Sequence, residues 1–102
     1  RYPVWWLYYL GQGYRLSGQY EKAIDTFKEA IALQPNNHRP HLWLGLAYSQ
    51  KGDLNNARAE VEKALRLSPK HSANVYAQVN PYKDPEDLKR DIDALRKAGL
   101  PE

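Results

Sequence analysis

An internal repeat of 34 residues constrains this chain more than any other feature of its sequence. Shifted by 34 positions, LGQGYRLSGQYEKAIDTFKEAIALQP (residues 10–35) aligns with LGLAYSQKGDLNNARAEVEKALRLSP (residues 44–69). The identical pairs are Leu10/Leu44, Gly11/Gly45, Tyr14/Tyr48, Gly18/Gly52, Ala23/Ala57, Ala30/Ala64, Leu33/Leu67 and Pro35/Pro69. A period of this length indicates a small structural unit that is repeated and stacked on itself.

Each copy of the repeat predicts two antiparallel helices, because apolar residues recur at helical spacing on both sides of a glycine. Gly18 and Gly52 stand where a residue with left-handed backbone can end the first helix. Pro35 and Pro69 end the second helix, because proline supplies no amide donor. The repeating unit is therefore predicted to be a helix pair.

Gly45 lies inside a predicted helix, where glycine costs about 1 kcal/mol relative to alanine. Gly11 occupies the same place in the first copy, and Ala23 and Ala57 stand opposite the two glycines in the second helices. Small residues on both sides let two helix backbones approach closely. We expect this contact to offset the unfavourable helix propensity of the glycines.

These residues resemble the tetratricopeptide repeat. The 34-residue period, with Leu-Gly, Tyr, Gly, Ala, Phe or Val, Ala and Pro in this order, is similar to the pattern of that family over residues 4–71. The resemblance implies an all-α fold, a right-handed superhelical stack of antiparallel helix pairs. We expect a single domain over residues 1–102, with repeat 1 at about 4–37, repeat 2 at about 38–71 and a diverged third helix pair at 72–102.

The third unit is predicted to cap the stack. SANVYAQVNPY predicts a short helix that ends near Asn80 and Pro81. DPEDLKRDIDALRKAGLPE predicts a longer helix, with Asp84 as the N-cap and Pro85 at the first helical position. Repeat arrays need a terminal unit that covers the last apolar face. The apolar stripe expected to do so consists of Leu88, Ile92 and Leu95.

A second, narrower resemblance concerns the C-terminal tail. NPYKDPEDLKRDIDALRKAGLPE, preceded by two such repeats, is similar to the end of the repeat region in some bacterial class III adenylate/guanylate cyclases. In those proteins a catalytic domain lies N-terminal to the repeats. The resemblance implies a non-catalytic regulatory or assembly domain in a bacterial signalling protein that makes cyclic nucleotides. The cyclase's own metal-binding and purine-recognition residues have no counterpart here.

The resemblance to tetratricopeptide repeats also implies a binding surface, since the first helices of the pairs line a concave face in that family. The residues of this chain that fall at those places, and are predicted to contact a partner, are Trp5, Tyr8, Tyr9, Gln12, Arg15, Arg39, Leu42, Trp43, Leu46 and Gln50. Tryptophan, tyrosine and arginine dominate binding hot spots. The partner is therefore expected to be a protein or peptide with acidic and apolar residues, including a second copy of the chain or the catalytic domain of its parent protein.

A competing interpretation applies to the first aromatic residues. Trp5, Trp6 and Tyr9 could instead pack against a preceding helix or against one another. Two further functions remain open: a basic repeat module associated with nucleic acid, and a purely structural spacer or end cap of a longer array. The nucleic-acid alternative is the weaker, because 15 basic and 12 acidic residues are interspersed and give a net charge of only +3.

Two clusters of polar residues could suggest chemistry: the histidines His38, His41 and His71, and the carboxylates Asp84, Glu86, Asp87, Asp91 and Asp93. His38 and His41 have no cysteine or carboxylate in register, so no metal site is predicted, and the histidines are expected to be solvated or to lie in turns. The carboxylates crowd the start of one predicted helix, where they complement its dipole and face solvent. We therefore predict no enzyme activity, no cofactor and no small-molecule substrate for this chain.

Composition narrows the setting. The chain has no cysteine, which excludes disulfides and thiolate metal ligands and makes a reducing, cytoplasmic location the default expectation. No apolar run approaches the roughly 20 residues that a transmembrane helix needs. The chain starts at Arg1 and contains no methionine, so we expect it to be a part of a longer protein.

Overall fold

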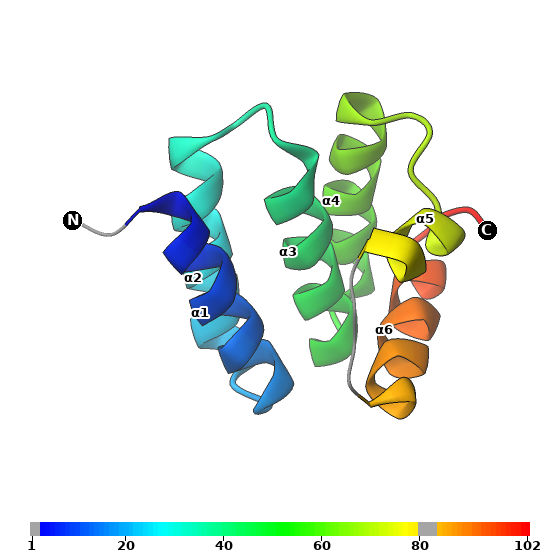
Figure 1. Ribbon diagram of the computed structural model, residues 1–102, viewed down its shortest axis with the longest axis horizontal. Coiled ribbons are helices and arrows are strands. Elements are labelled where there is room, and N and C mark those ends of the chain that lie inside the picture. Colours follow the sequence, from blue (N-terminus) through cyan, green and yellow to red (C-terminus); the bar gives the residue numbers. More distant parts are fainter. Residues whose placement is uncertain (1–2, 80–83) are drawn as a thin grey trace.

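The computed structural model describes residues 3–79 and 84–102. Within these ranges it contains helices and no strand, which confirms the predicted all-α stack of helix pairs (Figure 1). The helices are α1 (Val4–Leu16), α2 (Tyr20–Leu33), α3 (His38–Lys51), α4 (Leu54–Leu67), α5 (Ala73–Val79) and α6 (Pro85–Lys97). Among the described residues, no helix is both long enough and apolar enough to cross a membrane.

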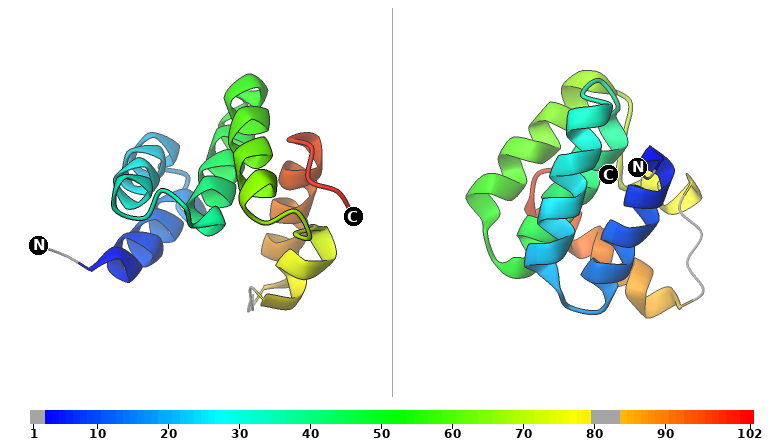
Figure 2. Two further views of the ribbon diagram at one scale, coloured as in Figure 1. Left: turned by 90° about the horizontal axis from the view of Figure 1, so that it is seen from above. Right: turned by 90° about the vertical axis from the view of Figure 1, so that its left-hand side faces the viewer.

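Consecutive helices pack as pairs, and the pairs meet at α3. Helix α1 packs against α2, α3 against α4 and α5 against α6, while α2 and α6 both pack against α3. Seen from above, α1 and α5 lie on the same side of the stack, one on either side of α3 (Figure 2, left). This arrangement brings residues of α1, α3 and α5 to a common face.

The helix ends form where the sequence predicts them. Gly18 and Gly52 adopt the left-handed backbone, with φ of 82° and 101°. Helices α2 and α4 stop two residues before their prolines. The Asp84 side chain accepts a hydrogen bond from the amide of Glu86 at 2.9 Å and caps α6 as predicted. The predicted end of the short helix at Asn80 and Pro81 lies outside the described residues.

Close helix contact explains the glycines inside the first helices of both repeats. A Cβ atom on Gly45 would lie 2.9 Å from Cγ2 of Val61 and 3.2 Å from the carbonyl oxygen of Ala57. The expected contact between small residues is therefore present in the second repeat. In the first repeat, a Cβ atom on Gly11 would clash with the ring of Phe27, so the nearest side chain is this ring and not Ala23.

The capping helix closes the core of the second repeat, as predicted. Leu95 is fully buried in a cluster with Leu46 and Val61, and Leu88 and Ile92 pack against its edge. A second cluster fills the space between α2 and α3, and its buried members are Ala23, Ile24, Phe27, Leu44 and Ala47. The two clusters place α3 at the centre of the molecule.

Candidate partner-binding groove

A cavity of about 530 Å³ opens on the face shared by α1, α3 and α5. We call it the aromatic groove. Of the predicted partner-binding residues, those that line it are Trp5, Tyr8, Tyr9, Gln12, Arg39, Leu42 and Trp43. The remaining lining residues, which were not predicted, are His38, Ser68, His71, Val75 and Tyr76. The groove thus combines residues of α1, of the first half of α3 and of the segment that follows α4.

Exposed aromatic rings stand on the α1 side of the groove. Trp5 is 55% exposed and Tyr9 is 71% exposed. The ring of Trp5 meets Trp6 and Tyr9 edge to face, with centroid distances of 6.3 and 6.1 Å. Aromatic pairs favour this geometry. The three rings therefore pack against one another, as one of the two competing interpretations proposed, and still offer apolar surface to solvent.

Trp43 lies deeper and joins the groove to the core. Its ring is 5.1 Å from Tyr8 and 6.0 Å from Phe27, measured between centroids. Tyr8 in turn donates a hydrogen bond to the side-chain oxygen of Gln34 and accepts one from Asn37 at 3.1 Å. Burial raises the pKa of Tyr8, although Arg39 and Asn37 oppose this. Both aromatic residues thus support the structure as well as the groove surface.

Three nitrogen-bearing side chains also line the groove: His38, Arg39 and His71. The imidazole rings of His38 and His71 lie 5.1 Å apart, and the exposed Arg39 follows His38 on α3. Burial lowers the pKa of both histidines; Arg39 adds repulsion at His38, and His38 and Arg39 add it at His71. Among the described residues, no aspartate or glutamate lines the groove. Arg39 therefore gives this part of the groove a positive charge that no acidic side chain of the described lining balances.

Sequence reasoning did not predict that His71 lines the groove, because it expected the histidines to be solvated or in turns, whereas His71 is only 6% exposed. The repeat does show that the two positions are equivalent, since His71 lies 34 residues after Asn37. Each of these residues stands just before the first helix of its unit. Asn37 caps α3 by accepting a hydrogen bond from the amide of Arg39 at 3.0 Å. Only packing against His38 and α5 turns the equivalent His71 toward the groove.

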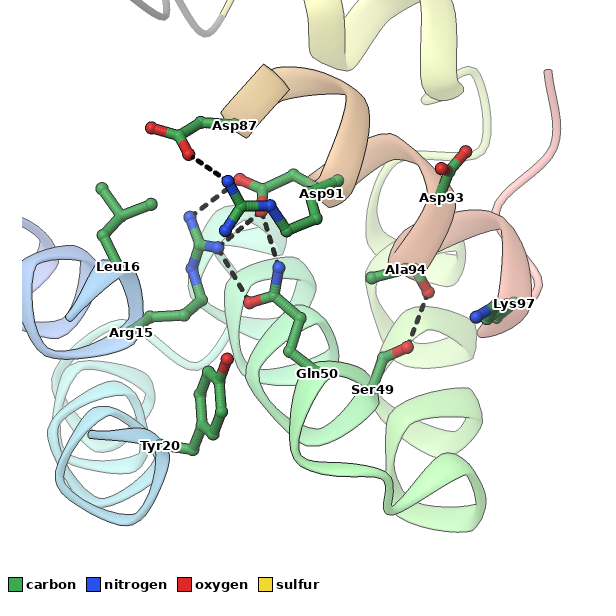
Figure 3. A pocket seen from close by; sticks show the side chains of 11 residues that line it. Arg15, Leu16, Tyr20, Ser49, Gln50, Asp87, Asp91, Asp93, Ala94 and Lys97 are labelled. Atoms are coloured by element: carbon green, nitrogen blue, oxygen red, sulfur yellow. Dashed lines mark hydrogen bonds and ion pairs between the residues drawn. The ribbon is translucent and has the colours of Figure 1, made fainter. Parts of the chain in front are cut away.

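The structure corrects the prediction for Arg15, which is only 2% exposed and cannot select a partner by charge. Its guanidinium donates to both carboxylate oxygens of Asp91, at 2.7 and 2.9 Å (Figure 3). Gln12 accepts from Arg15 Nε at 2.9 Å, and Gln50 bridges Arg15 and Asp91 at 3.0 and 2.8 Å. Asp91 is likewise buried, and not the solvent-facing carboxylate that was expected. The predicted contacts Arg15 and Gln50 thus belong to an internal network.

Leu42 and Leu46 are also corrected as exposed contacts. They are 2% and 0% exposed, because α5 and α6 pack over this part of α3 and bury it in the core. Leu42 still lines the groove, whereas Leu46 does not. The repeat pattern places both residues on the concave side of the helix but carries no information about the diverged unit that covers it.

The remaining histidine has a structural partner. His41 Nδ1 lies 3.0 Å from Oε1 of Glu60, and Nε2 lies 3.2 Å from the carbonyl oxygen of Pro35. The expectation of a solvated or turn histidine is therefore wrong for His41, which is 8% exposed and lies within α3. In the described part of the chain, no group of three or more His, Cys, Asp or Glu side chains is placed to hold a metal ion.

Stacked helix pairs, glycines at helix contacts and a groove across the first helices define a helical-repeat protein. Comparison with protein families agrees: a model described as TPR repeat matches residues 11–52, and one described as tetratricopeptide repeat matches residues 38–71. Residues 11–71 of this chain therefore consist of tetratricopeptide repeats.

Two curated relatives share part of this sequence. One is the cellulose synthase operon protein C of Escherichia coli strain K12, and the other is a protein of Escherichia coli O157:H7 with the same operon designation. Each is 48% identical to this chain over 58 residues, which is 57% of this chain and 5% of the relative. The chain thus covers a small part of the proteins it matches, and neither is named as a cyclase.

Proposed function

We propose that this chain is a non-catalytic protein-interaction module that binds a segment of a partner protein in the aromatic groove. Tetratricopeptide repeats indicate an interaction module in general terms. The observation that supports the groove as the site is its lining: exposed Trp5 and Tyr9 line the same cavity of about 530 Å³ as Arg39. Cavities of this size and aromatic character are typical of binding sites.

The parent protein is proposed to act with a cellulose synthase, because both relatives are named for a cellulose synthase operon. In such a protein this module would hold another component in place. A cyclase parent, implied by the resemblance of the tail, finds no support in these relatives. The cytoplasmic location and the weaker nucleic-acid alternative stay predictions.

Binding to decapeptide libraries tests the proposal directly. We would measure the affinity of the purified chain for randomised decapeptides by fluorescence polarisation, with Trp5→Ala and Tyr9→Ala as groove variants. Leu67→Ala is the matched control, because Leu67 is an exposed apolar residue, 40% accessible, that does not line the groove. We expect enrichment of apolar residues in the bound peptides and at least a fivefold loss in the groove variants alone.

Two other ligands of the groove would be recognised by further measurements on the same variants. A second copy of the chain would appear as a dimer in sedimentation that Tyr9→Ala dissociates. A glucan chain is a candidate because aromatic rings also pack on sugar rings and because of the names of the relatives; it would appear as binding of cellohexaose in place of peptides. No peptide enrichment, or equal loss in Leu67→Ala, would contradict the proposal.

A further inference from the structure

One side-chain nitrogen in the wall of the aromatic groove is buried and makes no hydrogen bond to any described residue. His71 is only 6% exposed, and its Nε2 atom has no hydrogen-bond partner among the described residues. Buried polar atoms are nearly always satisfied, and each exception calls for an explanation. His71 lines the groove, so a small side-chain rotation would bring its Nε2 atom to a group that occupies the groove.

The surroundings of His71 show which chemistry would suit this position. The titratable or charged side chains that line the groove with it are Tyr8 and Tyr9 from α1, His38 and Arg39 from α3, and Tyr76 from α5. None of them is acidic. His38 and Arg39 both disfavour the charged form of His71, which shows that the three groups are close enough to interact. A cluster of groups whose charged forms are all positive, with no acidic side chain among its described neighbours, favours an anionic ligand.

We infer that His38, Arg39 and His71 form a carboxylate-binding subsite, and that the segment bound in the aromatic groove presents an aspartate or glutamate to it. The inference rests on the proposed function and adds the chemistry of the partner. Arg39 supplies a permanent charge and paired donors. His71 supplies a buried donor, and the aromatic residues of the groove accept the apolar neighbours of the acidic residue.

The subsite makes binding depend on pH. Burial and the neighbouring positive groups lower the pKa of both imidazoles in the free chain, so both are neutral at pH 7.5. A carboxylate nearby raises the pKa of an imidazole, because it stabilises the imidazolium. Binding of the acidic segment therefore takes up protons, and by linkage its affinity rises as the pH falls from 7.5 to 5.5.

The test compares two decapeptide libraries that differ in one fixed residue, aspartate in one and asparagine in the other. Affinities are measured at pH 7.5 and 5.5 for the unmodified chain, His71→Gln and Arg39→Gln. Arg58→Gln is the matched control, since Arg58 is an exposed arginine outside the groove. Circular dichroism verifies that each variant keeps its helix content.

We expect the aspartate library to bind about tenfold more tightly than the asparagine library at pH 5.5, with a smaller difference at pH 7.5, as charge-assisted hydrogen bonds allow. His71→Gln should reduce the pH dependence to the part that His38 supplies, and Arg39→Gln should weaken aspartate binding at both pH values. If His71→Gln unfolds, the two libraries on the unmodified chain still decide.

Equal binding of the two libraries at both pH values would overturn the subsite and leave the peptide-binding function intact. The same holds if a folded His71→Gln variant keeps the full pH dependence. Failure of both libraries to bind would overturn the proposed function together with the subsite.

Discussion

Arg15 in α1 and Asp91 in α6 lie 76 residues apart in the chain and form a two-point ion pair of 2.7 and 2.9 Å that is almost fully buried. The pair ties the first helix of the stack to the last. Because both charges are out of water, each depends on the other. The pair therefore holds the two ends of the molecule in a fixed relation across α3.

Removal of one partner of this pair should be costly. We expect Asp91→Ala to lower the free energy of unfolding by about 3 kcal/mol, since it leaves the buried Arg15 without its counter-charge. Urea unfolding followed by circular dichroism measures the loss. Asp87→Ala is the control on the same helix, because Asp87 pairs with an Arg90 side chain that is 70% exposed, and it should cost less than about 1 kcal/mol. Equal losses in the two variants would contradict the role assigned to the buried pair.

Two helical glycines should respond in opposite ways to the same substitution. Gly45→Ala should lower the free energy of unfolding by about 1 to 3 kcal/mol, because the new methyl group would press on Val61 and the backbone of Ala57. Gly13→Ala should raise it by up to about 1 kcal/mol, since no atom lies within 4 Å of its Cβ position and alanine favours helix. Thermal and urea unfolding of the two variants provide the comparison, and a loss at both positions would contradict the contact.

Substitution of the two groove tryptophans should affect the free energy of unfolding to different extents. Trp43→Ala should lower the free energy of unfolding by about 2 to 3 kcal/mol, because Trp43 packs between Tyr8 and Phe27. Trp5→Ala should change it by less than about 0.5 kcal/mol, since the side chain is more than half exposed. Urea unfolding measures both. A large loss in Trp5→Ala would mean that this residue is structural and unsuitable as a groove probe.

The histidine pair should make the free chain less stable in mild acid. The folded state holds the pKa of His38 and His71 below that of the unfolded chain, near 6.5. The unfolded state therefore binds more protons below pH 6.5, and their contribution to stability, full above that pH, is lost as the pH falls through the folded pKa values. Unfolding free energies at pH 7.5 and 5.5 should differ less in His38→Gln/His71→Gln than in the unmodified chain. An unchanged difference would contradict this assignment.

Local sequence signals predicted the repeat architecture well. Gly18 and Gly52 end their helices because a left-handed residue is needed there, and that requirement is set by the chain within one turn. Asp84 caps α6 for an equally local reason. The places that face the groove on α1 and the start of α3 were implied by the resemblance to tetratricopeptide repeats, and Trp5, Tyr9 and Arg39 do line the groove.

The same local signals did not predict the burial of Arg15 and Leu46, or the position of His71 in the groove wall. Each depends on the diverged third unit, whose helices arrive from a distant part of the chain and do not follow the repeat. Helix α6 brings Asp91 to Arg15, and together with α5 it buries Leu46. The segment before α5 brings His71 against His38.

The sequence by itself thus determined the helix pairs and their ends, because helical periodicity, caps and left-handed glycines act over a few residues. The resemblance to tetratricopeptide repeats indicated the face on which the groove forms. Tertiary structure alone decided which side chains of that face remain open and what charge they carry. Burial and ion pairing depend on which distant segments of the chain come into contact. Neither the repeat period nor the composition predicts those contacts.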